Sequence, residues 1–268
     1  MTLLVGIRCS DGVVVAADQA VTFGDGARPT ISHRACKIEV VQNAVIVAGT
    51  GQVGMKQRLV ERVDQLWAVQ PGKLECIKAG KTPIEICNTI CSEMVNSFAT
   101  TKANMGVFGA LVAFPHSKSG SQLCEFATTD FQPELKDKGT WFVSMGSGQS
   151  LADPYLAFMK HVYWQDGMPK MEHALFAATW VMVMSITVAP GQVALPIDIA
   201  VLTDKTARML SAEQVSVHME AAKAATEHFG RFDPAKMDVG EAAPEGPAPA
   251  IPNLTGTIPI PKPGPATT

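Results

Sequence analysis

Four residues near the start of the sequence carry the functional groups of an acyl-transfer site. Thr2 has a hydroxyl, Asp18 a carboxylate and Lys37 an ammonium group, and Gly49 begins a glycine-rich turn. A hydroxyl is a weak nucleophile until a base takes its proton, and an amino-terminal threonine supplies that base as its own α-amine. Removal of Met1 is expected before a residue as small as Thr, and it would leave Thr2 with this free amine.

The other three residues each have a use in such chemistry. An α-amine has a pKa near ~7.7–8.0, close to neutral pH. The like charge of Lys37 would lower that pKa and increase the fraction of free base. We assign Asp18 to holding the Lys37 ammonium in place. The backbone N–H of Gly49 is expected to face the oxyanion that develops during attack, a contact worth roughly 10²–10³ in rate.

Two predicted hairpins place these groups at the ends of strands. The first pairs residues 3–7 with residues 13–17 across the turn Ser10-Asp11-Gly12, and the second pairs residues 37–41 with residues 44–48. Alternating apolar residues, a polar turn and a returning apolar run are the signal of a β-hairpin. The carboxylate and the glycine both stand where a return strand ends.

The rest of the sequence predicts two pairs of helices separated by strands. Thr82-Pro83-Ile84-Glu85 is a capping box with Pro at the first helical position. The order of elements predicts two stacked antiparallel sheets with a helix pair on each outer face, an α+β, four-layer αββα sandwich. Helices are expected over residues 52–69, from 82 onward, 152–163, 172–186 and 212–229, and later strands over 107–114, 123–128, 141–145, 195–202 and 207–210.

Length and composition suit one large domain followed by a tail. The chain has 268 residues, 47% of them hydrophobic, which is enough for a substantial core. Nine of the 36 residues at 233–268 are Pro, so we expect a domain over residues 1–232 and a Pro-rich tail that forms no core of its own.

Charge and cysteine patterns exclude several classes of protein. The net charge is −3 and basic residues form no block, which argues against binding nucleic acid or a membrane surface. The longest apolar run, at about residues 180–188, is far short of the ~20 residues of a membrane span. Six cysteines without CxxC pairs argue against a metal site or a disulfide framework. With no signal peptide in view, a cytoplasmic protein without a cofactor is expected.

Short motifs along the first fifty residues carry a family resemblance. They are Thr2-x-x-x-Gly6-Ile7, Asp11-Gly12-Val13-Val14-x-Ala16-Ala17-Asp18, Val21-Thr22-x-Gly24, Lys37-Ile38 and Ala48-Gly49-Thr50. Together they resemble the opening of a proteasome β subunit, and the similarity reaches about Thr203. The chain looks most like the self-standing bacterial proteasome homologues, including the peptidase half of the bacterial heat-shock ATPase–protease.

This resemblance implies an N-terminal nucleophile hydrolase fold and a threonine-type endopeptidase. Thr2 would be the nucleophile, supported by Asp18, Lys37, the oxyanion glycine Gly49, and Ser147 near the nucleophile. Peptides or unfolded proteins would be cut inside a homo-oligomer of two stacked rings, six- or sevenfold, with sevenfold our choice. An unidentified ATPase or regulator is a further partner to look for. The substrate-binding residues implied are Val21, Thr22, Ala35, Val47, Gly51 and Met55; because all are uncharged, we expect an apolar residue before the cut.

Several of these residues have a competing interpretation. Residues 49–54 read GxGxxG, the dinucleotide-binding fingerprint, although the preceding strand closes a hairpin. Lys37 lies four residues beyond the strict family spacing, so an inserted loop is expected before it. His33 and Arg34 are rival cations in that loop. Ser147 is alternatively a turn serine that caps the next helix.

The sequence departs from the family in its last loop. Proteasome β subunits have an Asp and a Ser before a Gly pair there, whereas this chain reads Ser185-Ile186-Thr187-Val188-Ala189-Pro190-Gly191. Thr187 is the candidate to replace the polar contact. A catalytically weak or inactive ring-forming scaffold is therefore the alternative to an active peptidase.

Overall fold

The computed structural model describes the backbone of residues 2–25, 28–68, 81–102, 104, 106–191, 193–204 and 206–231. It describes the side chains of the same residues except those within 22–32 and at 230. The chain divides into two units, Met1–Ala222 and Lys223–Thr268. The predicted Pro-rich tail lies outside the described residues. All of the architecture below belongs to the first unit, apart from the end of the last helix.

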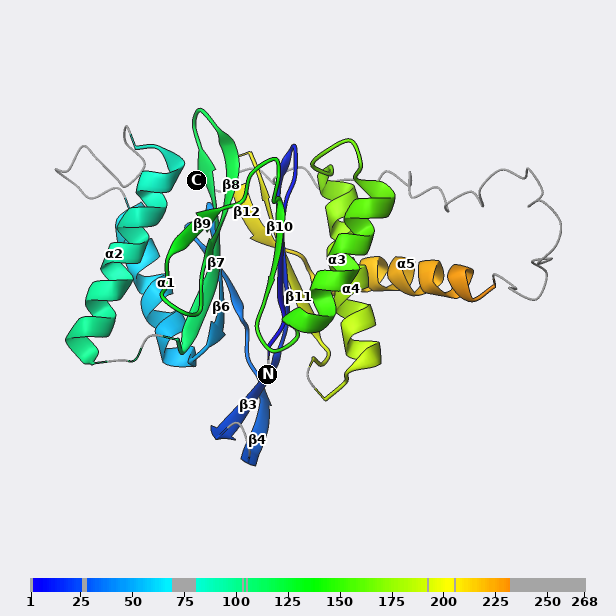
Figure 1. The fold of residues 1–268 in the computed structure, drawn as a ribbon, viewed down its shortest axis with the longest axis horizontal. Helices are drawn as coiled ribbons and strands as arrows, with labels where there is room; N and C mark the ends of the chain where they lie inside the picture. The colour runs from blue at the N-terminus through cyan, green and yellow to red at the C-terminus, as the bar shows by residue number, and fades with distance from the viewer. Residues whose placement is uncertain are drawn as a thin grey trace, which may run out of the picture. The chain divides into compact units, whose positions relative to one another are not determined.

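Two five-stranded antiparallel sheets form the centre of this unit (Figure 1). The order of the first sheet is β10-β1-β2-β11-β12, and the order of the second is β5-β6-β7-β8-β9. The first contains β1 (Leu4–Arg8), β2 (Gly12–Asp18), β10 (Phe142–Met145), β11 (Ile197–Thr203) and β12 (Thr206–Met209), and the second β5 (Ile38–Val41), β6 (Val45–Gly51), β7 (Phe108–His116), β8 (Gly120–Phe126) and β9 (Pro133–Leu135).

A pair of helices covers the outer face of each sheet (Figure 1). Helices α1 (Val53–Trp67) and α2 (Pro83–Thr101) pack on the second sheet, and α3 (Gln149–Tyr163) and α4 (Met171–Val188) on the first. A last helix, α5 (Ala212–Gly230), runs across the boundary between the two units. The predicted four-layer αββα sandwich is confirmed.

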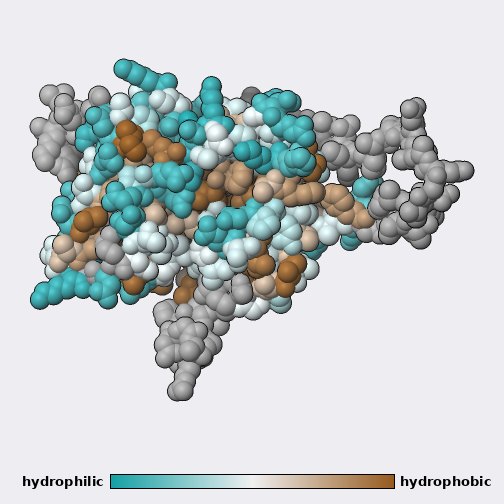
Figure 2. All heavy atoms as spheres, in the orientation of Figure 1, coloured by the Kyte–Doolittle hydropathy of each residue, from teal (hydrophilic) through white to brown (hydrophobic). Residues whose placement is uncertain are grey.

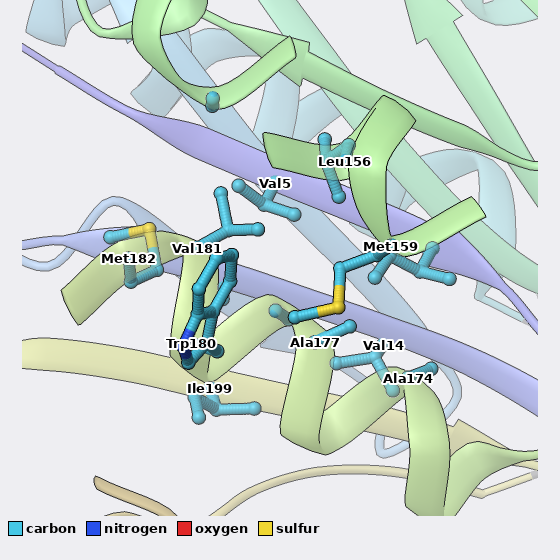
Figure 3. Close-up of a cluster of buried hydrophobic side chains, with 14 of the residues drawn as sticks. Val5, Val14, Leu156, Met159, Ala174, Ala177, Trp180, Val181, Met182 and Ile199 are labelled. Atoms are coloured by element: carbon cyan, nitrogen blue, oxygen red, sulfur yellow. The ribbon is translucent and has the colours of Figure 1, made fainter. Parts of the chain in front are cut away.

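Three hydrophobic layers hold the sandwich together. Between the sheets the side chains are mostly small or β-branched, such as Val13, Val15 and Ala48. These residues alternate along their strands with residues that face the helices, as the two-residue period of a strand requires. Figure 3 shows the layer under α3 and α4, where Trp180 and Met159 pack over strand residues of the first sheet.

Helix α4 is apolar enough for its packing to need an explanation. By length and composition it is the one helix among the described residues that passes as a membrane span. Eight of its residues, Ala174, Ala177, Ala178, Thr179, Trp180, Val181, Met182 and Ser185, are buried inside the protein. Contact with the first sheet and α3 therefore accounts for its apolar character.

One element was not anticipated as structure. The expected loop insertion before Lys37 is a third, two-stranded sheet made of β3 (Ala20–Asp25) and β4 (Arg28–Arg34). In Figure 1 this hairpin projects away from both five-stranded sheets. By local sequence preference Gly24-Asp25 favours a turn. In the structure both residues belong to β3, where Gly24 pairs with Pro29 and Asp25 with Arg28.

Phe131 tests the core between the second sheet and α2. Its side chain is 1% exposed, and its ring stacks on Phe126 at 4.9 Å and meets Phe98 edge-on at 5.6 Å between centroids. Phe131→Ala should lower the free energy of unfolding by about 3–5 kcal/mol, because it removes these contacts and leaves a cavity. Phe229→Ala, at a site 54% exposed, is the matched control and should change it by less than about 0.5 kcal/mol. Urea denaturation at one protein concentration measures both; equal effects would contradict this core.

Candidate active site

A cavity of about 220 Å³ opens where β6 ends and α1 begins. It brings together Thr2, Lys37, Gly49 and Ser147, which are far apart in the sequence. The two sheets supply these residues jointly, since Thr2 precedes β1 of the first sheet and Lys37 precedes β5 of the second. The remaining lining residues are Val21, Ala35, Cys36, Thr50, Gly51, Gln52, Val53, Lys56 and Phe108.

Asp18 and Lys37 form a buried ion pair behind this cavity. The Lys37 Nζ lies 2.7 Å from Asp18 Oδ1, and the residues are 4% and 0% exposed. The same Oδ1 accepts the Leu3 N–H at 2.7 Å, and Oδ2 accepts the Ala20 N–H at 3.1 Å. Burial lowers the pKa of Lys37, and the Asp18 carboxylate opposes that shift. The rival cations His33 and Arg34 lie exposed on β4.

The loop between β10 and α3 fixes Thr2. The Thr2 N–H donates to Ser147 Oγ at 3.0 Å, and the Gly148 N–H donates to the Thr2 carbonyl oxygen at 3.1 Å. Gly146 has a φ of +97°, and a Cβ there would lie 2.4 Å from the Thr2 carbonyl oxygen. Only glycine therefore permits this approach. Ser147 is not the cap of α3: the N-cap residue is Gly148, and no side chain caps the helix.

The expectation of an open N–H at Gly49 is wrong in this structure. That N–H donates to the Lys37 carbonyl oxygen at 3.1 Å, as part of the pairing of β5 with β6. Gly49 contributes space instead. A Cβ at this position would lie 2.8 Å from Lys56 Cγ and 2.9 Å from a ring carbon of Phe108. The glycine therefore lets both side chains close over the strand.

The implied substrate-binding residues are only partly brought together. Val21, Ala35 and Gly51 line the cavity. Val47 and Met55 do not: both are buried in the core with α1 and α2, so the structure corrects this part of the prediction. The side chain of Thr22 lies outside the described residues.

Lys56 is a cavity residue that the sequence prediction missed. It stands in the first turn of α1, and its Nζ lies 2.6 Å from Glu39 Oε1 and 2.7 Å from the Cys36 carbonyl oxygen. The reason given for an apolar preference, that no charge is available, is therefore wrong. A signal was present, because Lys56 precedes the apolar positions Leu59 and Val63 by three and seven residues and so shares their helix face.

The altered last loop takes no part in the cavity. Helix α4 continues through Ser185 and Thr187 to Val188. The Thr187 hydroxyl donates to the Val183 carbonyl oxygen at 2.8 Å, within its own helix, and Thr187 does not line the cavity. The expectation that Thr187 replaces the family contact is therefore wrong.

The GxGxxG run does not form a dinucleotide-binding turn. Gly49 and Gly51 belong to β6, which pairs antiparallel with both β5 and β7. The fingerprint requires a parallel βαβ unit. Within the described part of the chain, α1 is followed by α2, and every strand pairing of the two large sheets is antiparallel.

The buried ion pair predicts strong coupling between its members. Asp18→Asn and Lys37→Met should each destabilise the fold by about 3–5 kcal/mol, since each leaves a buried charge without its partner. The double variant should lose less than the sum of the two, because no uncompensated charge remains. Glu134→Gln, which removes a largely exposed partner of Lys136, is a control expected to cost at most about 1 kcal/mol. Additive losses in urea denaturation would contradict the pairing.

Comparisons with known proteins identify the family of the chain. The model of the proteasome subunit family matches residues 2–179 of the chain. Proteasome subunit beta 2 of Pyrococcus abyssi (strain GE5 / Orsay) is 36% identical over 81 residues, which make up 29% of this chain and 38% of that relative. The match thus spans well under half of the length of this curated relative.

Solved structures establish the fold independently. Anbu (ancestral beta-subunit) from Yersinia bercovieri superimposes with a TM-score of 0.64 at 14% identity, covering 88% of this chain and 100% of that one. The helical assembly of the Anbu complex from Pseudomonas aeruginosa gives a TM-score of 0.63 at 13% identity, covering 86% and 97%. Because the family model matches well over half of the sequence, and the same four-layer fold recurs in these structures, the chain belongs to the proteasome subunit family.

Proposed function

We propose that this chain is a threonine-type endopeptidase whose nucleophile is Thr2, exposed by removal of Met1. The observation that carries the proposal is the convergence of Thr2, Ser147 and the buried Lys37–Asp18 pair on one cavity. The substrates would be peptides or unfolded proteins, cut in the cytoplasm inside a homo-oligomer that keeps folded proteins away from the site.

Each group has a defined part in the proposed reaction. The Thr2 α-amine takes the proton of its own hydroxyl, and the Thr2 oxygen attacks the peptide carbonyl to give a tetrahedral intermediate. The proton passes to the departing amine, which leaves an ester on Thr2, and water then hydrolyses that ester. Ser147 Oγ lies within hydrogen-bonding distance of the Thr2 nitrogen and orients it. The Lys37 ammonium, held by Asp18, favours the neutral amine.

We assign the oxyanion contact to Gly51 instead of Gly49. Backbone N–H groups alternate between the two sides of a strand. The Gly49 N–H is directed to β5, and the Gln52 N–H donates to the Val107 carbonyl oxygen on the opposite side at 3.1 Å. The Gly51 N–H is therefore directed to the same side of β6 as β5. There it lies beyond the Gly49–Lys37 hydrogen bond, at a residue that lines the cavity.

Substitution of Thr2 tests the reaction directly. A peptide epoxyketone should add its mass to residue 2 of the wild-type protein, and Thr2→Ala should abolish the adduct because the nucleophile is gone. Thr2→Ser keeps a hydroxyl and an amine, so it should retain labelling, and it serves as the matched control. Intact mass should show complete loss of Met1 in the native host. Labelling that survives in Thr2→Ala would refute the assignment.

A ring-forming scaffold is the second candidate. The observation that favours it is the missing polar contact from the end of α4, where Thr187 bonds within its own helix. The same labelling experiment separates the two functions, because a scaffold would keep Met1 and leave Thr2 unlabelled.

Exposed apolar side chains on the α3–α4 layer support assembly into an oligomer. Phe158 and Val162 of α3 and Val188 at the end of α4 are exposed, and Phe158 stacks on Trp180. Figure 2 shows apolar surface among hydrophilic side chains on this side of the molecule. Burial of such side chains between copies would remove them from water. We propose stacked homo-oligomeric rings, with sevenfold symmetry and an ATPase partner as open predictions.

Native mass spectrometry at micromolar concentration tests the assembly. A mass of about fourteen subunits is expected by analogy with two stacked sevenfold rings, and twelve subunits would correct the symmetry alone. Phe158→Asp should shift the population to smaller species, because a charge would be buried at the interface. Val217→Asp, on exposed α5 surface, is the matched control and should leave the mass distribution unchanged. A wild-type monomer or dimer would overturn the proposal.

A further inference from the structure

Lys56 places a cation in the wall of the cavity that would hold the substrate. Its stem passes over Gly49, where the absent Cβ leaves room for it beside Phe108. Val47 and Met55 lie in the core with α1 and α2 and take no part in the lining. A substrate in the cavity therefore meets the Lys56 side chain, together with Phe108 and with uncharged lining residues such as Val21, Ala35 and Val53.

The Lys56 side chain is nearly buried, but the carboxylate that pairs with it is exposed to solvent. The Lys56 side chain is 10% exposed, whereas that of its partner Glu39 is 42% exposed. An ammonium has three N–H donors, and the contacts found in the described structure use two of them, on Glu39 Oε1 and on the Cys36 carbonyl oxygen. The cation therefore has room for one more acceptor.

Exchange of partners is favourable for a carboxylate that enters the cavity. Water competes strongly for an exposed carboxylate such as Glu39, so its pairing contributes little and its return to solvent costs little. A substrate carboxylate that fills the cavity displaces water, and the same charge interaction is stronger in that drier surrounding. The entering group also satisfies the remaining ammonium donor.

The rest of the lining favours the same sign of charge. Among the described lining residues the charged side chains are Lys37 and Lys56, and none is a carboxylate. Lys37 is already held by Asp18. A basic substrate side chain would meet the like charge of Lys37 and Lys56, with no carboxylate in the described lining to pair with it, so it is disfavoured more strongly than a neutral side chain.

We propose that Lys56 makes the cavity specific for an acidic residue immediately before the cleaved bond. The proposal rests on the proposed peptidase function and names its substrate class. Lys56 is then a specificity-determining residue, with Glu39 as the group that holds the ammonium until substrate arrives. The favoured substrates are peptide segments in which Glu or Asp precedes the cut.

Four fluorogenic peptides that differ only in the residue before the cut test this. Glu should be cleaved with a kcat/KM about 10- to 100-fold above that of isosteric Gln, the range of one charged hydrogen bond. Arg should be the slowest, and Leu should not exceed Glu. Faster cleavage after Leu or Arg than after Glu would overturn the inference while leaving the peptidase function in place. Absence of all cleavage, with no adduct on Thr2, would overturn both.

Variants of Lys56 separate specificity from structure. Lys56→Met keeps the stem and should bring the Glu/Gln ratio to about 1, because only the charged contact is lost. Lys56→Arg keeps the charge and should retain most of the ratio. Glu39→Gln should leave the ratio intact or raise it. Equal Glu/Gln ratios in wild type and Lys56→Met, with circular dichroism unchanged, would overturn the role of Lys56.

Discussion

The site depends on one ion pair that is held out of water. Asp18 ends a strand of the first sheet, and Lys37 stands just before a strand of the second, so their contact joins the sheets at one end of the sandwich. Two charges in a dry interior are costly unless their geometry is good and the other lone pairs are satisfied. Asp18 meets that condition, because its two oxygens accept the N–H groups of Leu3 and Ala20 as well as the ammonium of Lys37. The bond from Leu3 also ties the segment that carries Thr2 to the same carboxylate.

Small residues make the close approaches around that pair possible. Gly146 lets the β10–α3 loop pass against the Thr2 carbonyl oxygen, which positions Ser147 on the Thr2 nitrogen. Gly49 has the equivalent effect on the other side of the cavity, where it admits Lys56 and Phe108. Each glycine replaces a side chain that would hold two elements apart by the width of a methyl group. The polar groups therefore converge because glycine at these two positions leaves room for the neighbouring segments. A larger residue at either position would separate them.

The sequence predicted the parts of this structure that depend on local pattern. Apolar periodicity placed the helices and the two hairpins, and α4 differs from its expected range by only one residue at the start and two at the end. The family resemblance placed Lys37, and the structure pairs it with Asp18. The packing of one element against another could not be predicted from the same local patterns. The helix face that Lys56 shares with Leu59 and Val63 could be found in the sequence, but that Met55 packs in the core while Lys56 lines the cavity depends on the rotation of α1 over β6. Whether the Gly49 N–H is open depends on the register of β5, which leaves no local signal.

The energetics of buried charge favour a reactive site over a purely structural ring subunit. A subunit that only packs against its neighbours gains nothing from burying Lys37, because well-packed apolar residues of similar volume are often as stabilising as a buried ion pair or more so. The pair lies behind a cavity that also contains a second cation, the ammonium of Lys56, whose partner Glu39 is exposed to solvent. Burial also lowers the pKa of Lys37, which is the kind of perturbation that gathers where protons are transferred. The protein thus accepts the cost of burying a charged pair beside the cavity that contains Thr2.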